Sequence, residues 1–100
     1  MMNSALPPTG HVVTPDGVSI GYTLHTANGR SGSGKRARVA LIHSLALDRS
    51  IWDGVVPLLT SHADVLTYDC RGHGRSTRVK MKYTPELFAA DFACLLDHVR

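Results

Sequence analysis

Two polar segments, each directly behind an apolar run, hold most of the residues of this sequence that could do chemistry. Residues 43–48 are His-Ser-Leu-Ala-Leu-Asp, and residues 69–76 are Asp-Cys-Arg-Gly-His-Gly-Arg-Ser. Histidine, serine, cysteine and aspartate are side chains of acid–base and nucleophilic catalysis. A turn behind a strand can also aim free backbone N–H groups at a reacting carbonyl oxygen, which stabilises an oxyanion. Both segments therefore border a candidate site.

Neither segment contains a complete catalytic set. No nucleophile elbow is predicted in these 100 residues: neither Ser44 nor Ser76 has elbow glycines on both sides, and the G-x-S-x-G match at residues 17–21 lies in the predicted hairpin. His73 is too close to Ser76 in a glycine loop to predict a supported dyad. His43, taken alone, is more typical of a hydrogen-bonded turn residue than of a base. The segments predict the rim of a site rather than its nucleophile.

The elements that would position these segments form an α/β order. Apolar and alternating patterns predict strands at residues 11–13, 18–25, 38–43 and 63–68. Helices are predicted over residues 50–59 and from Pro85 onward, the second with Thr84 as its N-cap. Thr14-Pro15-Asp16-Gly17 predicts a hairpin turn between the first two strands. The continuous apolar run at 38–43 predicts a strand covered on both faces, and residues 1–10 are expected to form a flexible tail.

Composition narrows the function classes. With 43% apolar residues and a net charge of +3, the chain is expected to be one globular domain or part of one. Cys70 and Cys94 form no disulfide framework, so a cytoplasmic protein is expected, and no run approaches the ~20 apolar residues of a membrane span. Five basic residues lie between positions 71 and 82 without an acid. They indicate either a solvated loop or a surface for anionic ligands, and without interleaved aromatics they do not predict nucleic-acid binding.

Two further patterns are not expected to bind ligands. Residues 29–35 match the phosphate-loop pattern G-x-x-x-x-G-K, but Arg36 replaces the hydroxyl residue and a strand, not a helix, follows. A flexible connector is the better interpretation. The six histidines include no HExxH helix and no Cys/His pair at ligand spacing, so neither a metal nor a cofactor is expected.

The order of elements and motifs resembles the α/β-hydrolase fold family from about His11 to Arg100. The resemblance rests on the hairpin, on the strand ending in His43, on Trp52 nine residues later, and on the block behind the strand at 63–68. The structural motif residues of that block are Asp69, Arg71, Gly72, His73, Gly74 and Ser76. In it, Asp69 and Arg71 are expected to brace the turn. The resemblance implies that residues 11–100 are the N-terminal portion of a hydrolase domain, truncated before the nucleophile elbow. The nucleophile, acid and catalytic histidine are then expected beyond residue 100.

The resemblance also implies a role for the segment at 43–48. The family's loop behind the third strand supplies one oxyanion N–H, and by position that residue is Leu45. Ser44 stands where glycine is usual, and serine has less backbone freedom. The His-Ser-Leu sequence, followed by Asp48 and Trp52, is similar to 3-oxoadipate enol-lactonases. This implies hydrolysis of a small ester or lactone, such as a carboxylate-bearing enol-lactone, with Ser44 and Trp52 at the pocket rim.

The alternative interpretation is a non-catalytic fragment or interaction remnant. Without a neighbouring nucleophile strand, residues 39–42 become an unpaired apolar edge, which promotes association. The 100 residues alone are therefore expected to self-associate and to lack activity. The expected partners are a small-molecule substrate and a second copy, not nucleic acid or a membrane. The type of nucleophile stays open, so esterase, lactonase, dehalogenase and epoxide hydrolase chemistry all remain.

Overall fold

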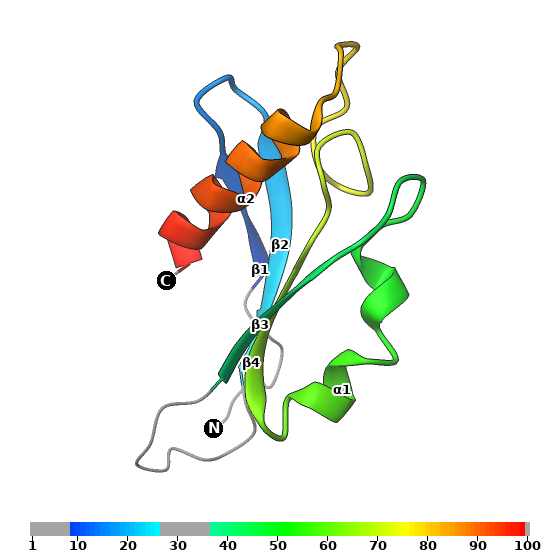
Figure 1. The fold of residues 1–100 in the computed structure, drawn as a ribbon, viewed down its shortest axis with the longest axis vertical. Helices are drawn as coiled ribbons and strands as arrows, with labels where there is room; N and C mark the ends of the chain where they lie inside the picture. Colours follow the sequence, from blue (N-terminus) through cyan, green and yellow to red (C-terminus); the bar gives the residue numbers. More distant parts are fainter. Residues whose placement is uncertain (1–8, 27–36, 100) are drawn as a thin grey trace.

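The computed structural model describes residues 9–26 and 37–99, which form a four-stranded sheet with helices on both faces (Figure 1). The strands are β1 (Thr9–Val13), β2 (Ser19–His25), β3 (Ala37–Ile42) and β4 (Ala63–Tyr68). The helices are the 3₁₀ helix η1 (Arg49–Trp52), α1 (Val56–Leu59) and α2 (Pro85–Val99). In the sheet order β1-β2-β4-β3, the pairs β1–β2 and β2–β4 are antiparallel and β3–β4 is parallel. The predicted hairpin followed by two parallel strands is confirmed.

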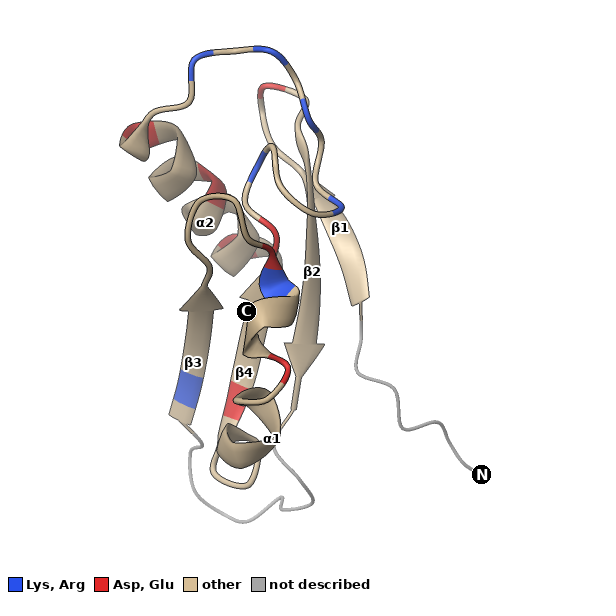
Figure 2. Ribbon diagram, turned by 90° about the vertical axis from the view of Figure 1, so that its right-hand side faces the viewer, with Lys and Arg blue, Asp and Glu red and all other residues tan. Residues whose placement is uncertain are grey.

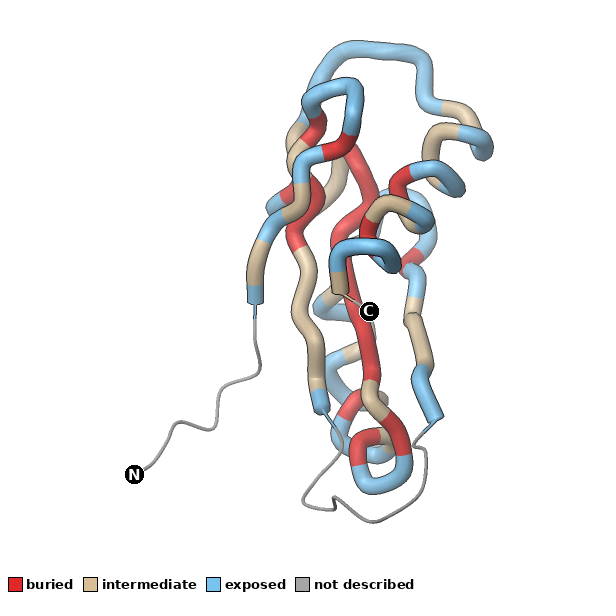
Figure 3. The backbone as a smooth tube through the Cα atoms, turned by 90° about the vertical axis from the view of Figure 1, so that its left-hand side faces the viewer, coloured by how far each residue is buried: buried red, intermediate tan, exposed pale blue. Residues whose placement is uncertain are grey.

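The core lies between α2 and the sheet. Side chains of β2 alternate as predicted, so that Ile20 is buried and Tyr22 and Leu24 pack against the same apolar cluster. In Figure 3 buried positions follow most of β4, one of the two inner strands of the sheet. Leu95 of α2 is fully buried in this cluster. The loop behind β4 therefore starts from the most buried strand of the sheet.

Helix α2 begins where its capping residues predict. The Leu87 N–H donates to the Thr84 hydroxyl oxygen at 3.1 Å, which satisfies one of the free amides of the first turn. Pro85 occupies the first helical position, where its missing N–H costs nothing. Glu86 lies in the first turn, near the positive end of the helix dipole. This cap places the start of α2 beside the ends of β3 and β4.

Several predicted boundaries differ from the structure: the bounds of the strands predicted at 18–25 and 38–43 differ by one residue, and two differences are larger. The single helix predicted over residues 50–59 is wrong: η1 and the one-turn helix α1 are separated by turn residues that include Gly54. Pro57, in the first turn of α1, has no N–H to continue a preceding helix. Strand β1 begins at Thr9, two residues earlier than predicted and within the expected tail. The G-x-x-x-x-G-K pattern lies outside the described residues.

Strand β3 has one free edge. It pairs with β4 in parallel from Ala37 opposite Ala63 to Ile42 opposite Tyr68. Within residues 9–26 and 37–99, no strand pairs with its other side. Its side chains are therefore only partly covered, and Ile42 is 48% exposed. The cover on both faces that the apolar run predicts is therefore incomplete among the described residues, where positions 39–41 are half-buried.

Candidate active site

An open groove of ≈810 Å³ lies where β3 and β4 end and α2 begins. Its walls come from three segments: the turn behind β3, the loop behind β4, and the first turns of α2. They contribute His43, Ser44 and Leu45; Cys70 and His73; and Tyr83, Phe88 and Phe92, among others. The C-terminal ends of parallel strands are where open α/β sheets bind ligands. The structure thus brings four residues that the sequence analysis named to one groove: His43, Ser44, Leu45 and His73.

The turn behind β3 presents backbone donors rather than reactive side chains. The Leu47 N–H donates to the Ser44 carbonyl at 3.2 Å, and Ala46, the third residue of this turn, has φ of 68°. Leu45 has negative φ, so the turn is of type II. The Leu45 side chain is 74% exposed, and its N–H bonds to no other described residue. This N–H is free to bind an oxyanion.

The backbone strain of this turn lies at Ala46 and not at Ser44. The sequence places the conformational cost at Ser44, because glycine is usual there, but Ser44 has negative φ. Ala46 is the single described non-glycine residue with positive φ. The left-handed conformation costs an L-residue roughly 1–2 kcal/mol. Strain of this kind persists only where the surroundings hold it, often beside functional groups.

His43 holds the turn against the loop behind β4. The Cys70 N–H lies 3.0 Å from the Nε2 of His43 and can only donate, so Nε2 must accept. The ring proton is then on Nδ1, which donates to the Ser44 carbonyl at 2.8 Å. The ring is buried and lies 5.0 Å from the ring of His73 between centroids. Both nitrogens of His43 are thus occupied by structural hydrogen bonds.

The loop behind β4 is built around the buried carboxylate of Asp69. Its Oδ1 accepts the Arg49 N–H at 2.8 Å, and its Oδ2 accepts the Arg75 N–H at 3.0 Å. At Gly74, φ is 49° and a Cβ would lie 2.4 Å from the carboxyl carbon of Asp69. Glycine is therefore required there by both space and conformation. Asp69 organises the loop from within, in agreement with a bracing role.

Ser76 and Gly72 hold the same loop against neighbouring segments. The Ser76 hydroxyl donates to the Asp69 carbonyl at 2.5 Å and accepts the Gly21 N–H at 2.9 Å, which ties the loop to β2. Gly72 has φ of 80°, and a Cβ there would lie 2.8 Å from the hydroxyl of Tyr83. Both residues therefore serve packing, and neither offers a group to a substrate.

Arg71 is 1% exposed and joins three elements. Its Nε and Nη2 each donate to an oxygen of Asp91 in α2 at 2.7 Å, and its Nη1 and Nη2 donate to Asp16 in the hairpin turn at 2.9 and 3.2 Å. The hydrogen bonds to Asp91 first, then to Asp16, raise the pKa of Arg71, and the bond from Arg71 lowers the pKa of Asp16 to about 2. Arg71 therefore braces the loop from within the protein, and it does not face the groove.

Sequence reasoning missed the two partners of Arg71. Asp91 carried a readable signal, because it lies three residues after Phe88 and four before Leu95, on the apolar stripe of α2. An acid within such a stripe is buried only when paired. Asp16 carried no signal beyond its place in the hairpin turn.

The basic residues between positions 71 and 82 divide into one buried and four exposed side chains. Arg75, Arg78, Lys80 and Lys82 are exposed on the loop that leads into α2, where Figure 2 shows Lys and Arg in blue. The Nη2 of Arg78 donates to the Gly74 carbonyl at 3.2 Å. The four exposed cations border the groove without entering its lining.

The structure does not bring Trp52 to the groove. Trp52 ends η1, which lies with α1 on the face of the sheet opposite α2 (Figure 1). Its indole Nε1 is buried and has no hydrogen-bond partner among the described residues. The expected place of Trp52 at the pocket rim is therefore not met within this part of the chain.

The described lining of the groove contains no nucleophile–base pair. Burial raises the pKa of the Cys70 thiol, so this thiol stays protonated and unreactive. The Nδ1 of His73 lies 3.0 Å from the Arg71 carbonyl, and no hydroxyl of a described residue bonds to this ring. Across residues 9–26 and 37–99, no three acidic, histidine or cysteine side chains gather as metal ligands. No helix of these residues is long and apolar enough to cross a membrane.

Known proteins match both this fold and this arrangement of loops. The family model for the alpha/beta hydrolase fold matches residues 38–100. The chain belongs to the α/β-hydrolase fold family.

Three relatives illustrate the similarity. A protein of Mycobacterium tuberculosis named probable oxidoreductase EphD is 38% identical over 87 residues, which are 85% of this chain and 14% of that protein. The crystal structure of a hydrolase from Pseudomonas aeruginosa PA01 is 34% identical with a TM-score of 0.80, over 91% of this chain and 32% of that one. The enol-lactonase from Burkholderia xenovorans LB400 is 31% identical with a TM-score of 0.76, over 88% and 32%. The chain therefore spans a third or less of the length of these relatives.

Proposed function

We propose that this chain forms one wall of the active site of an α/β hydrolase that hydrolyses a small ester or lactone. In this proposal the Leu45 N–H is one oxyanion donor. The nucleophile, the acid and the catalytic histidine come from residues of the hydrolase domain that are not among these 100. The nucleophile attacks the substrate carbonyl, and the N–H stabilises the negative oxygen of the tetrahedral intermediate. Collapse of this intermediate breaks the C–O bond of the ester or lactone, so that the alcohol oxygen leaves with a proton and an acyl-enzyme remains. Water then attacks the acyl-enzyme, which releases the acid product and the free nucleophile.

The observation that carries this proposal is the free Leu45 N–H at the C-terminal end of β3. The amide bonds to no other described residue and belongs to a residue that lines the groove. Its position agrees with the role that the family resemblance implies for Leu45. Removal of one oxyanion donor typically lowers kcat by about 10²–10³-fold. The loss of this one backbone amide is therefore expected to have an effect on kcat that can be measured.

The substrate class that we propose is a carboxylate-bearing enol-lactone. Support comes from the 31% identity to the Burkholderia enol-lactonase. The groove offers apolar walls such as Phe88 and Phe92 to a small ring. The four exposed cations beside it would attract an anionic substrate over a distance of about a Debye length.

The test is a chimera in which this chain replaces the matching third of the Burkholderia enzyme. Two variants at one position separate the N–H from the side chain. Leu45→Pro removes the N–H, and proline suits the second position of a type II turn. Leu45→Ala keeps the N–H and removes only an exposed side chain. We expect Leu45→Pro to lower kcat by about 10²–10³-fold and Leu45→Ala to have little effect. Equal activity of both variants would contradict the proposal.

The 100 residues alone serve as a second test of the same proposal. Since they contain no elbow and no nucleophile–base pair in the described groove, we expect no turnover of a simple aryl ester by the purified chain. Measured turnover that co-purifies with the chain would contradict this expectation.

A second candidate function is association with another copy of this chain through β3. The supporting observation is the free edge, which lacks the protection that natural edges carry. Residues Ala37–Ile42 include no proline and one charge, Arg38, at the start of the strand. In an antiparallel pair of two β3 strands, the two Arg38 side chains lie at opposite ends of the ladder. Like charges then do not face each other.

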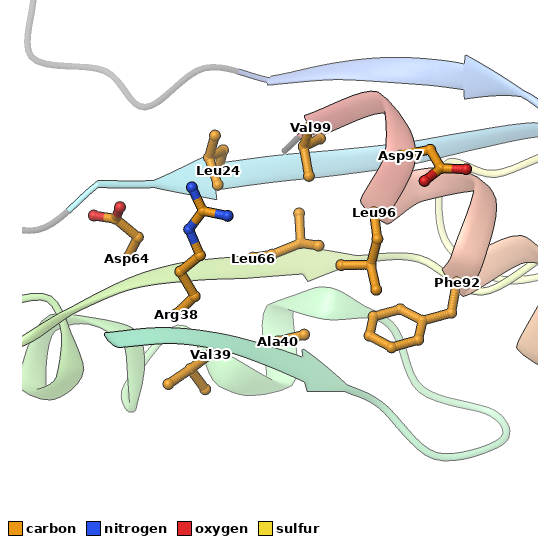
Figure 4. A pocket seen from close by; sticks show the side chains of 10 residues that line it. All are labelled: Leu24, Arg38, Val39, Ala40, Asp64, Leu66, Phe92, Leu96, Asp97 and Val99. Carbon is orange, nitrogen blue, oxygen red and sulfur yellow. The ribbon is translucent and has the colours of Figure 1, made fainter. Parts of the chain in front are cut away.

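A second groove lies along the same edge and supports this candidate. It has a volume of ≈690 Å³ and lies between α2 and the β3 side of the sheet. Figure 4 shows Leu66, Phe92 and Leu96 facing one another there, with Arg38, Asp64 and Asp97 toward its margins. Phe92 lines both grooves, so one partly apolar surface accompanies the whole of β3.

Two matched lysine substitutions test the association. Ile42→Lys places a charge at the end of β3, and Val13→Lys places one at the end of β1, the other edge strand, where Val13 is also exposed. By sedimentation velocity we expect a concentration-dependent dimer that Ile42→Lys weakens and Val13→Lys leaves intact. A wild-type monomer at all concentrations, or equal effects of both variants, would contradict association through β3.

A further inference from the structure

We propose that His43 is the positioning residue for the Leu45 N–H, acting through the peptide group that joins Ser44 to Leu45. This inference rests on the proposed function, in which the same N–H binds the oxyanion. His43 itself has no nitrogen left for a substrate, because both nitrogens are hydrogen-bonded within the protein.

One planar peptide group connects the hydrogen bond of His43 to the direction of the Leu45 N–H. The Ser44 carbonyl and the Leu45 N–H belong to the same peptide group, and in a trans peptide the oxygen and the hydrogen point to opposite sides. The carbonyl oxygen is held by two donors, the Nδ1–H of His43 at 2.8 Å and the Leu47 N–H at 3.2 Å. Whatever holds the oxygen on one side therefore holds the N–H on the other.

The imidazole is suited to this because its two nitrogens face two different loops. Nε2 accepts the Cys70 N–H at 3.0 Å, and Cys70 continues the central strand β4. That bond leaves the ring proton on Nδ1, where it can donate to the Ser44 carbonyl. The imidazole thus fixes the orientation of the exposed turn relative to β4, the most buried strand of the sheet. A side chain with a single polar atom could not make both bonds.

The same bonds explain how a strained and exposed turn keeps one conformation. Ala46 has φ of 68°, a conformation that alanine adopts only when its surroundings impose it. The Leu47 bond closes the type II turn, and the His43 bond fixes the plane of the peptide at its start. Without the imidazole, one restraint on the Ser44 carbonyl remains and rotation of the Ser44–Leu45 peptide becomes possible.

Two amide variants separate the two bonds of His43. His43→Asn can keep a donor near the Nδ1 position and loses the acceptor for Cys70. His43→Gln can keep an acceptor near the Nε2 position and loses the donor to Ser44. If His43 acts through the peptide, His43→Asn preserves the orientation of the Leu45 N–H and His43→Gln does not. A merely structural histidine predicts that the two variants differ only in stability.

The first readout is spectroscopic and uses the unaltered 100-residue chain. Nitrogen-15 NMR of His43 should show Nδ1 in the protonated range and Nε2 in the unprotonated range, because the hydrogen bonds require that tautomer. The opposite tautomer would overturn the proposal without any variant. In His43→Gln we expect the Ser44 carbonyl carbon shift and the HN–Hα coupling of Leu45 to change. In His43→Asn both should stay close to wild type, and equal changes in the two variants would also overturn it.

The second readout is kinetic and uses the enol-lactonase chimera. We expect His43→Gln to lower kcat by about 10²-fold with little change in KM, as misplacement of a catalytic group does, and His43→Asn to retain most of the rate. Equal loss in both variants, or loss through KM, would contradict positioning. If the NMR result holds while Leu45→Pro leaves turnover unchanged, the proposed function fails and the positioning of the amide stands.

Discussion

The loops behind the two parallel strands, residues 43–48 and 69–76, differ in almost every physical property. The loop behind β4 is largely buried, and Asp69, Arg71 and Ser76 all have hydrogen-bond partners inside the protein. The turn behind β3 is largely exposed and carries a free amide beside a strained Ala46. The segment with more ionisable side chains is therefore the scaffold, and the plainer one carries the candidate chemistry.

The difference has a physical cause. A buried charge is costly unless its hydrogen bonds are complete, so the side chains of the loop behind β4 are used up in satisfying one another. An oxyanion donor must have no protein partner until substrate binds. An unpaired N–H costs little free energy only where water can hydrogen-bond to it, as at an exposed turn. Charged residues around a groove therefore say less about its chemistry than an unpaired amide does.

The largest expected effect is the loss of the Arg71 side chain. Arg71→Leu leaves Asp91 buried without a partner, and breaking a buried pair in this way costs about 3–5 kcal/mol. Urea unfolding of the variant measures this loss in the free energy of unfolding. Arg78→Leu, at an exposed position of the same loop, is the control and should stay within about 0.5 kcal/mol of wild type. A loss below about 1 kcal/mol for Arg71→Leu would mean that the loop is not held by this pair.

The next effect concerns the space around Asp69. Gly74→Ala places a Cβ 2.4 Å from the carboxyl carbon of Asp69 at positive φ, so we expect a loss of about 2–4 kcal/mol. Gly54→Ala is the matched control, because no atom lies within 4 Å of a Cβ there. Thermal unfolding of the two variants compares them. Equal stability of both would show that the Asp69 loop yields more easily than its packing indicates.

The turn behind β3 should respond in the opposite direction. Ala46→Gly relieves the positive φ and should stabilise the chain by about 0.5–1 kcal/mol, net of the entropy of glycine. Ala90→Gly, at an exposed position of α2, should instead destabilise by about 1 kcal/mol. Both changes are measured by urea unfolding. Destabilisation by Ala46→Gly would remove the contrast between a strained turn and a relaxed loop.

The smallest effect is the pH dependence contributed by Asp16. Its pKa is about 2 in the folded chain against an ordinary 3.8, first because of the hydrogen bond from Arg71 and then because of that from Thr14. A lowered folded-state pKa means that this stability is fully present above the unfolded value and is lost as the pH falls from about 3.8 through about 2. Asp16→Asn should make the free energy of unfolding depend less on pH in that range and leave its pH dependence near neutrality unchanged. Urea unfolding at a series of pH values measures this. If the free energy of unfolding depends on acidic pH as it does in the wild type, Asp16 does not gain stability from its hydrogen bond to Arg71.

Local patterns predicted most of the fold. The strand at residues 63–68 has the predicted bounds, and α2 begins at the predicted proline, because apolar runs and caps act over a few neighbouring residues. The helix over residues 50–59 was wrong, since Gly54 and Pro57 outweigh an apolar spacing that was only approximate. Leu45 was predicted as a site residue from the family resemblance alone, because no local sequence pattern distinguishes it.

By itself, the sequence determined the order of strands and helices and the two polar segments behind the parallel strands. The G-x-S-x-G match at residues 17–21 is no nucleophile elbow, because Ser19 begins β2 behind the hairpin turn and no helix follows it. Only the tertiary structure decided which polar residues are used up inside the protein. The bonds of Arg71 span 20 and 55 residues, and the bond from Cys70 to His43 spans 27. Such partners are set by the packing of the strands, the hairpin turn and α2 against one another, and no pattern within one segment specifies them. The same packing leaves the Leu45 amide unpaired at the groove.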